Sequence, residues 1–293
     1  MTDWKGSFTA LVTPFHNGSL DEQALERLLD YQLAGRSAGI IPCATTGEGP
    51  TVAPEEFRRI LELTLAKAKG KTAVLAYTGT NDTVQTIAKT REAEKMGADG
   101  ALVVTPYYNK PTQEGLYQHF KAVAKATKLP LMLYNVPSRT GVSIDPGTVA
   151  RLAEIDNIVA IKEASGSLDQ ATQIIELCGD RCVVFSGDDS LTLPLLAVGA
   201  RGVVSVVANV APKDTAKLVS SFLEGKADEA RRIHLKQFPL IKALFVETSP
   251  GPVKCALNLL GLCHADLRMP LVDVTDDTRK VIKQELKRYG LLK

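Results

Sequence analysis

The sequence predicts an α/β protein, a (β/α)8 TIM barrel with a C-terminal helical extension. Short apolar runs recur at intervals of about 25 to 35 residues, and amphipathic helical patterns separate them, as repeated strand–helix units require. Eight runs are present, which is the number of strands that closes such a barrel. They cover residues 8–12, 39–43, 73–77, 100–104, 131–134, 158–161, 182–185 and 202–206.

Helix start signals, which combine a capping side chain or a proline with acidic residues, lie between the runs. The clearest are Ser19 to Glu22, Pro54 to Glu56, Asn81-Asp82 and Thr112 to Glu114. The first matches a capping box with Ser19 as the capping residue. A doubly wound open sheet is the structural rival, but it often carries a glycine-rich turn after its first strand, and residues 13–16 contain no glycine.

The pattern changes after about residue 224, where helical patterns continue without strands between them. The expected helices cover residues 226–237, 253–260 and 278–289. We therefore predict a catalytic barrel over residues 1–224 and a C-terminal helical domain over residues 225–293.

Composition indicates an ordinary globular protein that acts on a small molecule. The 293 residues are 45% hydrophobic and 23% charged, and 35 basic against 33 acidic side chains leave a formal charge of +2. This balance argues against a nucleic-acid or membrane surface, which needs clustered basic charge. The N-terminus is charged where a signal peptide would be apolar, and no run approaches the ~20 apolar residues of a membrane span. We expect a cytoplasmic protein.

The cysteines also fit a reducing compartment. They form an odd set without the C-x-x-C spacing of redox or metal motifs. They are Cys43, Cys178, Cys182, Cys255 and Cys263. We expect free thiols rather than disulfides.

Lys162 interrupts an apolar strand pattern. A strand buried on both faces is nearly continuously apolar, so a lysine within it either extends to solvent or has a function. Desolvation lowers the pKa of an amine and makes a neutral nucleophile available. On this residue alone, a solvent-facing lysine at a strand end is the more common case.

Further polar residues follow the carboxyl ends of other predicted strands, where barrel enzymes place their catalytic groups. They are Thr45-Thr46, Tyr107-Tyr108, Tyr134, Arg139, Gly187-Asp188-Asp189 and Ser205. Each has an ordinary structural explanation, such as a packed tyrosine or a surface ion pair. Their collection at one end of the barrel favours an active site.

The residue types at this end indicate Schiff-base chemistry on a carbonyl substrate, because a lysine nucleophile is accompanied by hydroxyl groups that can move protons. The histidines are scattered without ligand spacing, which disfavours a metal-dependent aldolase. They are His16, His119, His234 and His264. Asp188 and Asp189 would repel a phosphate from the corner where many barrels bind one, so a phosphorylated substrate is disfavoured.

Several motifs closely resemble the dihydrodipicolinate synthase (4-hydroxy-tetrahydrodipicolinate synthase) family, within the superfamily of pyruvate-dependent class I aldolases and lyases. They lie at residues 45–48, 107–111, 134–141 and 161–164. The resemblance extends from Gly6 to the C-terminal helices. The lysine and the tyrosine are shared by the superfamily, whereas the Ser-Arg-Thr-Gly motif at 138–141 points more narrowly to the synthase.

The resemblance implies a lyase that condenses pyruvate with L-aspartate 4-semialdehyde to 4-hydroxy-tetrahydrodipicolinate, in lysine and diaminopimelate biosynthesis. Lys162 would form the imine with pyruvate, and no other cofactor or metal is implied. Tyr134 would be the proton donor, and Thr45 and Tyr108 would complete a hydroxyl relay. In this family Tyr108 is lent across an interface, which implies a dimer and usually a homotetramer built as a dimer of dimers.

The resemblance also implies the substrate-binding residues. Thr46 would bind the pyruvate carboxylate, and Val204 would line the pyruvate pocket. Arg139 would hold the carboxylate of the semialdehyde, and Gly187 is expected among the substrate-binding residues. Two alternatives stay open: a retro-aldol 2-keto acid lyase of the same superfamily (N-acetylneuraminate or keto-deoxy-sugar type), and a non-catalytic small-molecule binding protein on the same fold.

Lysine feedback is expected to be weak. The region that matches the feedback site of inhibited members carries Pro54, Phe57, Asn81 and Gln85. Inhibited members tend to have a histidine and a carboxylate at the positions of Phe57 and Gln85, so a lysine ammonium would meet less negative charge here.

Overall fold

A computed structural model describes residues 4–293. Eight of its strands form one closed parallel barrel in the order β1-β10-β9-β8-β7-β6-β5-β4, which confirms the predicted (β/α)8 class. The strands are β1 Gly6–Ala10, β2 Phe15–His16, β3 Ser19–Leu20, β4 Gly39–Ile41, β5 Ala73–Tyr77, β6 Gly100–Val104, β7 Leu131–Asn135, β8 Ile158–Glu163, β9 Val183–Ser186 and β10 Gly202–Ser205. β2 and β3 form a separate antiparallel hairpin.

The helices alternate with the strands up to β10 and then follow one another, as expected. They are α1 Glu22–Ala34, α2 Pro54–Ala68, α3 Thr83–Met96, α4 Gln113–Lys125, α5 Pro137–Thr140, α6 Pro146–Leu152, α7 Leu168–Cys178, α8 Thr192–Ala197, α9 Pro212–Leu223, α10 Ala227–Ala243, α11 Gly251–Leu259 and α12 Asp276–Tyr289. Short 3-10 turns lie at Gly49–Thr51, Gly179–Arg181, Asp189–Leu191 and Val207–Asn209.

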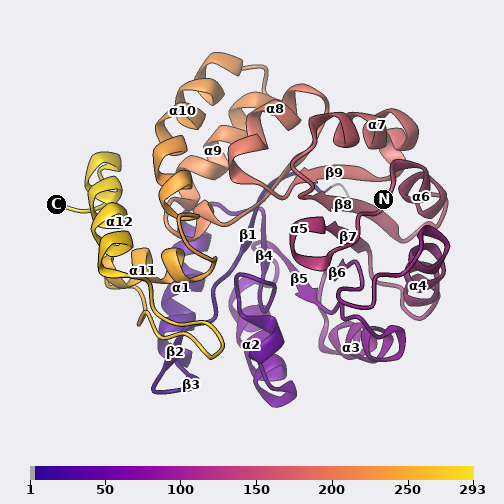
Figure 1. The fold of residues 1–293 in the computed structure, drawn as a ribbon, viewed down its shortest axis with the longest axis horizontal. Coiled ribbons are helices and arrows are strands. Elements are labelled where there is room, and N and C mark those ends of the chain that lie inside the picture. The colour runs from indigo at the N-terminus through magenta and orange to yellow at the C-terminus, as the bar shows by residue number, and fades with distance from the viewer. Residues whose placement is uncertain (1–3) are drawn as a thin grey trace. The chain divides into compact units, whose positions relative to one another are not determined.

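Two compact units make up the described chain. The first contains residues 4–6 and 73–204. Its strands β5 to β9 pair in parallel in chain order, and nearly every residue in them is buried, as expected for strands covered on both faces. Figure 1 shows α3, α4, α6 and α7 on the outside of these strands.

A register shift between β7 and β8 matters for the site. Leu131 pairs with Ile158, but the next residue, Met132, pairs with Ala160. Val159 is therefore the extra residue of a β-bulge. Beyond the bulge, Tyr134 pairs directly with Lys162, so the two side chains leave the same face of the sheet.

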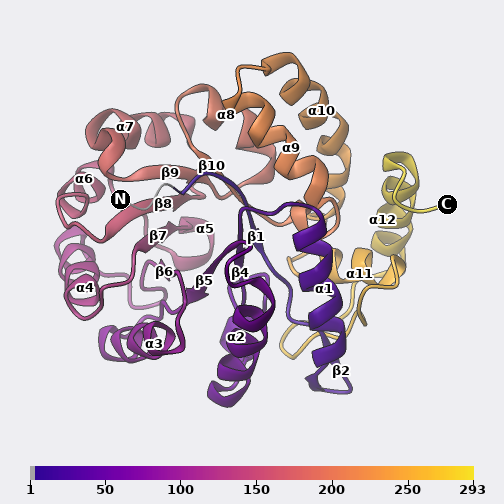
Figure 2. The same ribbon diagram turned by 180° about the vertical axis from the view of Figure 1, so that it is seen from behind.

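The second unit contains residues 7–72 and 205–293. β1 pairs with β4, and Phe8 lies opposite Gly39. A Cβ atom at Gly39 would lie 2.4 Å from the Phe8 ring, so the position requires glycine. Among the C-terminal helices, α10 packs against both α9 and α12, and α11 packs against α12; Figure 2 shows α9 and α10 side by side.

Two local predictions need correction. Ser19 does not cap α1: it belongs to β3, and the N-cap is Asp21, whose carboxylate accepts the N–H of Ala24. The Asn17-Gly18 pair, with φ of 51° and 79°, turns the β2–β3 hairpin instead, as this dipeptide commonly does.

The first C-terminal helix is longer than expected. It continues through Pro239 to Ala243, although proline removes one helical hydrogen bond. The last turn is retained because Leu240 and Ile241 are buried there. The predicted domain boundary at residue 224 stays a prediction.

All five cysteines are buried and none is in a disulfide. Within residues 4–293, no helix is long and apolar enough to cross a membrane.

His119 on α4 is a buried histidine in the first unit. Its Nδ1 lies 2.9 Å from the Thr83 hydroxyl, and its Nε2 is buried without a hydrogen-bond partner among the described residues. Burial lowers the pKa of His119 to about 4, against the opposing charge of Asp82. The folded protein therefore contains the neutral ring over most of the pH range.

This lowered pKa predicts an acid-dependent loss of stability. The unfolded chain takes up a proton near pH 6.5 and the folded chain only near 4, so the contribution is present above pH 6.5 and is lost as the pH falls. We expect His119→Gln to flatten the decline in unfolding free energy between these pH values by up to about 3 kcal/mol. Urea titrations at several pH values measure this, and parallel curves for the two proteins would contradict it.

Candidate active site

Lys162 and Tyr134 form the centre of the candidate site in the first unit. Both are 4% exposed, and the Lys162 Nζ lies 4.1 Å from the centroid of the Tyr134 ring. Lys162 is therefore not the solvent-facing lysine that is common at a strand end. A buried amine beside a phenol is an arrangement in which a nucleophile and a proton donor can act together.

The ends of β7 and β8 are fixed by a buried hydrogen-bond network next to this pair. Asn135 Nδ2 donates to Glu163 Oε2 at 3.0 Å, and Asn135 Oδ1 accepts the N–H of Ile144 at 3.1 Å. The other carboxylate oxygen of Glu163 accepts the N–H of Ser165 at 2.7 Å. Burial raises the pKa of Glu163, while the hydrogen bonds from Ser165 and Asn135 act in the opposite direction. These contacts orient the residues that immediately follow Tyr134 and Lys162.

Tyr77, at the end of β5, is a further candidate for the site that the sequence analysis did not name. It is buried, and burial raises the pKa of its hydroxyl. Tyr134 and Tyr107 raise the pKa of Tyr77 further, while Arg139 lowers it, so these side chains lie within electrostatic reach of one another. Its position as the last residue of a predicted strand was the available signal.

The loops after β6 and β7 carry the more exposed candidates. Tyr107 is half-buried, whereas Tyr108 is 88% exposed with φ of 70°, a conformation that is uncommon for a bulky residue. Arg139 is exposed on the single-turn helix α5, and its backbone N–H donates to the carbonyl of Val136 at 2.9 Å.

Gly187 and Val204 are the two remaining predicted site residues that lie in the first unit. The N–H of Gly187 donates to the carbonyl of Glu163 at 2.7 Å, and a Cβ atom there would lie 2.5 Å from the Cβ of Ala164. Val204 is fully buried in β10. Burial raises the pKa of Asp188, against the charge of Lys162, which places that carboxyl near the amine.

Thr45 and Thr46 belong to the second unit, so their part in the site stays a prediction. They lie in the loop after β4, where Thr46 is buried and Thr45 is half-buried. The loop is compact. The backbone carbonyl of Thr45 accepts the N–H of Glu48 at 3.1 Å, and the Thr13 hydroxyl donates to the carbonyl of Gly47 at 2.6 Å. A Cβ atom at Gly47 would lie 2.8 Å from backbone atoms of Cys43 and Leu11.

A buried ion pair holds this threonine loop and was not predicted. Glu48 Oε1 accepts from Lys254 Nζ at 2.7 Å, and the two side chains are 1% and 0% exposed. Glu48 Oε2 accepts the N–H of Arg268 at 2.9 Å. The Lys254 ammonium also donates to the carbonyl of Asp266. Burial lowers the pKa of Lys254, while Glu48 opposes this shift.

Arg268 extends the same network to α2. Its guanidinium donates to both carboxylate oxygens of Glu56 and to the carbonyl of Thr51 at 2.9 Å. The Glu56 carboxylate in turn accepts the N–H of Ala53 at 3.0 Å. This bond caps the N-terminus of α2, which begins at Pro54 as predicted. The threonine loop is thus connected to the C-terminal segment by charged groups.

A buried lysine at the carboxyl end of a barrel strand, next to a tyrosine, is typical of the (β/α)8 proteins that can form an imine with a carbonyl compound. The sequence profile of the Dihydrodipicolinate synthetase family matches residues 3–289. The chain therefore belongs to the dihydrodipicolinate synthetase family.

Individual relatives agree over the full length. The 4-hydroxy-tetrahydrodipicolinate synthase of Pelobacter propionicus is 52% identical over 289 residues, which are 99% of this chain and 100% of the relative. The crystal structure of dihydrodipicolinate synthase from Thermotoga maritima has a TM-score of 0.97 and 47% identity, and the match covers 99% of each chain. A structure described as a monomeric dihydrodipicolinate synthase variant has a TM-score of 0.97 and 46% identity, covering 99% of this chain and 98% of that one.

The Lys254–Glu48 pair allows a stability prediction. Lys254→Met leaves the Glu48 carboxylate buried without its counter-charge, and we expect a loss of about 3–5 kcal/mol in unfolding free energy. In the double variant Lys254→Met/Glu48→Gln no uncompensated charge remains, so a large part of the loss should be recovered. Chemical denaturation of the single and double variants measures both values. A loss below about 1 kcal/mol in the single variant would contradict the role of the pair.

Proposed function

We propose that this chain condenses pyruvate with L-aspartate 4-semialdehyde to 4-hydroxy-tetrahydrodipicolinate, the product that gives its relatives their name, 4-hydroxy-tetrahydrodipicolinate synthase. The observation that carries the proposal is the buried Lys162 amine 4.1 Å from the Tyr134 ring. The relatives, at about half identity over nearly the whole chain, support the choice of substrates. The product serves lysine and diaminopimelate biosynthesis.

The proposed reaction begins with attack of the neutral Lys162 amine on the pyruvate ketone, and loss of water gives an imine. The imine withdraws electrons, so a methyl proton leaves and an enamine forms. The enamine carbon attacks the aldehyde of the second substrate, and its oxygen takes up a proton. The amino group of that substrate then attacks the imine carbon and displaces Lys162, so the net loss is one water.

Each proton moves a short distance, and we assign these transfers to Tyr134 with Thr45 and Tyr108. Hydroxyl groups can relay protons without a fixed buried charge. General acid–base help of this kind is typically worth about 10²–10⁴ in rate. Thr46, Val204 and Gly187 would bind pyruvate, and no cofactor beyond the covalent imine is needed.

We further propose that Tyr108 serves the site of a neighbouring subunit in a homotetramer. Its side chain is 88% exposed on a loop with a positive φ, so its hydroxyl is available to a second copy of the chain. A cytoplasmic location is part of the same proposal, because the substrates are metabolites and buried thiols suit a reducing compartment.

Reductive trapping tests the imine. Treatment with pyruvate and borohydride should add one pyruvate-derived group to Lys162, detected by mass spectrometry of the digested protein, and Lys162→Ala should take up none. Lys125→Ala, at the end of α4, is the control and should be trapped like the unchanged protein. Absence of an adduct on Lys162 would defeat this function and the retro-aldol alternative together.

Arg139 separates the two enzymatic functions. A coupled assay on Arg139→Ala should show impaired use of aspartate semialdehyde, while trapping of pyruvate is retained, because a guanidinium can hold the second carboxylate. Cleavage of an N-acetylneuraminate-type keto acid, with no condensation activity in the unchanged protein, would favour the retro-aldol lyase instead.

Weak lysine inhibition follows from the residues at the expected feedback region. Phe57 is buried in α2, and the Gln85 amide donates to Asp82 Oδ2 at 3.3 Å. We expect no half-inhibition at sub-millimolar lysine, and greater sensitivity in Gln85→Glu, which restores a carboxylate. Rate measurements with added lysine test both, and strong inhibition of the unchanged protein would reject the proposal.

A further inference from the structure

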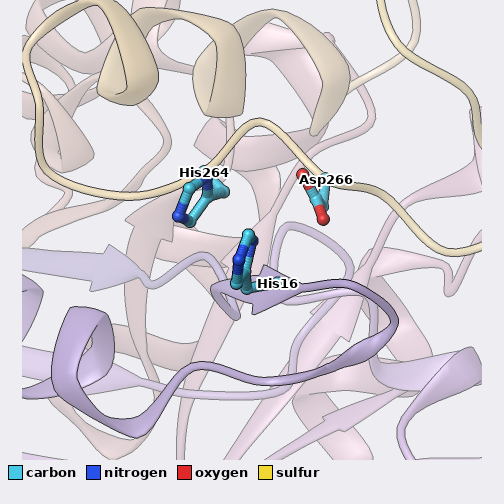
Figure 3. Close-up of side chains that lie close together, drawn as sticks. All are labelled: His16, His264 and Asp266. Carbon is cyan, nitrogen blue, oxygen red and sulfur yellow. The ribbon is translucent and has the colours of Figure 1, made fainter.

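Two exposed histidines and a carboxylate meet in the second unit, although they come from opposite ends of the chain. His16 lies in β2, and His264 and Asp266 lie in the segment between α11 and α12. Figure 3 shows the His16 ring close to the His264 ring, with the Asp266 side chain next to both. The spacing of these residues in the sequence gave no sign of this arrangement. None of the three is among the residues assigned to the candidate active site.

The geometry is close to that of a transition-metal site. One potential ligand atom from each residue lies within 4.8 Å of the others, and the two imidazoles stack with centroids 3.8 Å apart and planes 19° apart. A tetrahedral zinc site with bonds of about 2.0–2.1 Å requires ligand atoms about 3.4 Å apart. Both histidine side chains are exposed, so the structure leaves them room to rotate toward a bound ion.

The backbone on both sides is already fixed. The N–H of Asn17 donates to Asp266 Oδ2 at 2.9 Å, which holds the hairpin against the C-terminal segment and orients the carboxylate. The carbonyl of Asp266 accepts from the buried ammonium of Lys254. The Asn17 side chain lies 3.2 Å from His16 Nε2. Partners of this kind, which orient the ligands, commonly raise the affinity of a metal site.

The charge around the cluster is mixed. A surface pocket of about 610 Å³ is lined by both histidines together with Asp21, Glu22 and Arg27. The Glu22 carboxylate is paired with Arg59 at 2.8 Å, and Asp21 Oδ1 caps α1 by accepting the N–H of Ala24 at 2.9 Å. Asp266 is the carboxylate that lies within reach of both imidazoles. Two imidazoles and one carboxylate favour a zinc-like divalent ion over magnesium or calcium, which require oxygen ligands.

We propose that His16, His264 and Asp266 bind one divalent transition-metal ion of the zinc type, with water at the remaining coordination position. The ion would connect the β2–β3 hairpin to the segment that precedes α12. Because it binds the folded chain through residues far apart in sequence, it would stabilise the fold by mass action.

Zinc titration of the chelator-treated, full-length protein tests the proposal. Calorimetry should detect one equivalent of bound Zn²⁺ with a rise in Tm, and Mg²⁺ should produce neither. His264→Ala and His16→Gln should each weaken Zn²⁺ binding at least about tenfold. Gln23→Ala, at an exposed residue of the same pocket, is the matched control and should bind like the unchanged protein.

Co²⁺ supplies a second measurement that does not depend on stability. Bound to the unchanged protein, it should give visible d–d absorption, and His264→Ala should not, provided its circular dichroism is that of a folded protein. Equal Zn²⁺ affinity of the unchanged protein and both histidine variants would assign the binding to other surface groups and overturn the proposal. Absence of Zn²⁺ binding by the unchanged protein would overturn it as well.

Discussion

The ion pair between Lys254 and Glu48 joins helix α11 to the loop after β4. Both charges are out of water, and the desolvation of a single buried ion costs several kcal/mol unless a partner compensates it. Here the partner is supplemented by the N–H of Arg268 and the carbonyl of Asp266. Loss of either residue would leave the other as an uncompensated buried charge and lower the free energy of unfolding.

Through this pair, the C-terminal helical segment holds the threonine loop in place. Glu48 directly follows Thr45, Thr46 and Gly47, and its left-handed conformation, with φ of 54°, turns the chain so that its carboxylate points inward. The cations also contact the ring of Phe15, with Lys254 Nζ at 4.7 Å and Arg268 Cζ at 4.0 Å. The Phe15 ring thus contacts both cationic residues, and the same two residues bind Glu48, so these contacts connect the hairpin, the threonine loop and the C-terminal segment.

Local patterns in the sequence were sufficient for the barrel and for the placement of Lys162 and Tyr134, because strands and amphipathic helices have short periods. They were insufficient where two distant segments meet. Lys254 lies within a helical pattern that gives no indication of a buried charge, and Glu48 reads as an ordinary loop acid. The pairing of His16 with His264 was missed for the same reason. Tyr77 was missed because an aromatic residue at a strand end usually only packs.

The bulge at Val159 determines which face of the sheet carries Lys162. If Val159 paired with Met132 instead of forming the bulge, the pairing that starts at Leu131 and Ile158 would place Ile161 opposite Tyr134, and Lys162 would leave the other face, toward the helices. Deletion of Val159 would remove the bulge and keep Lys162 opposite Tyr134, whereas one residue inserted between Ile161 and Lys162 would separate the amine from the phenol and leave both side chains chemically intact. In evolution, this site can thus lose its nucleophile through an insertion in β8 as well as through a substitution of Lys162.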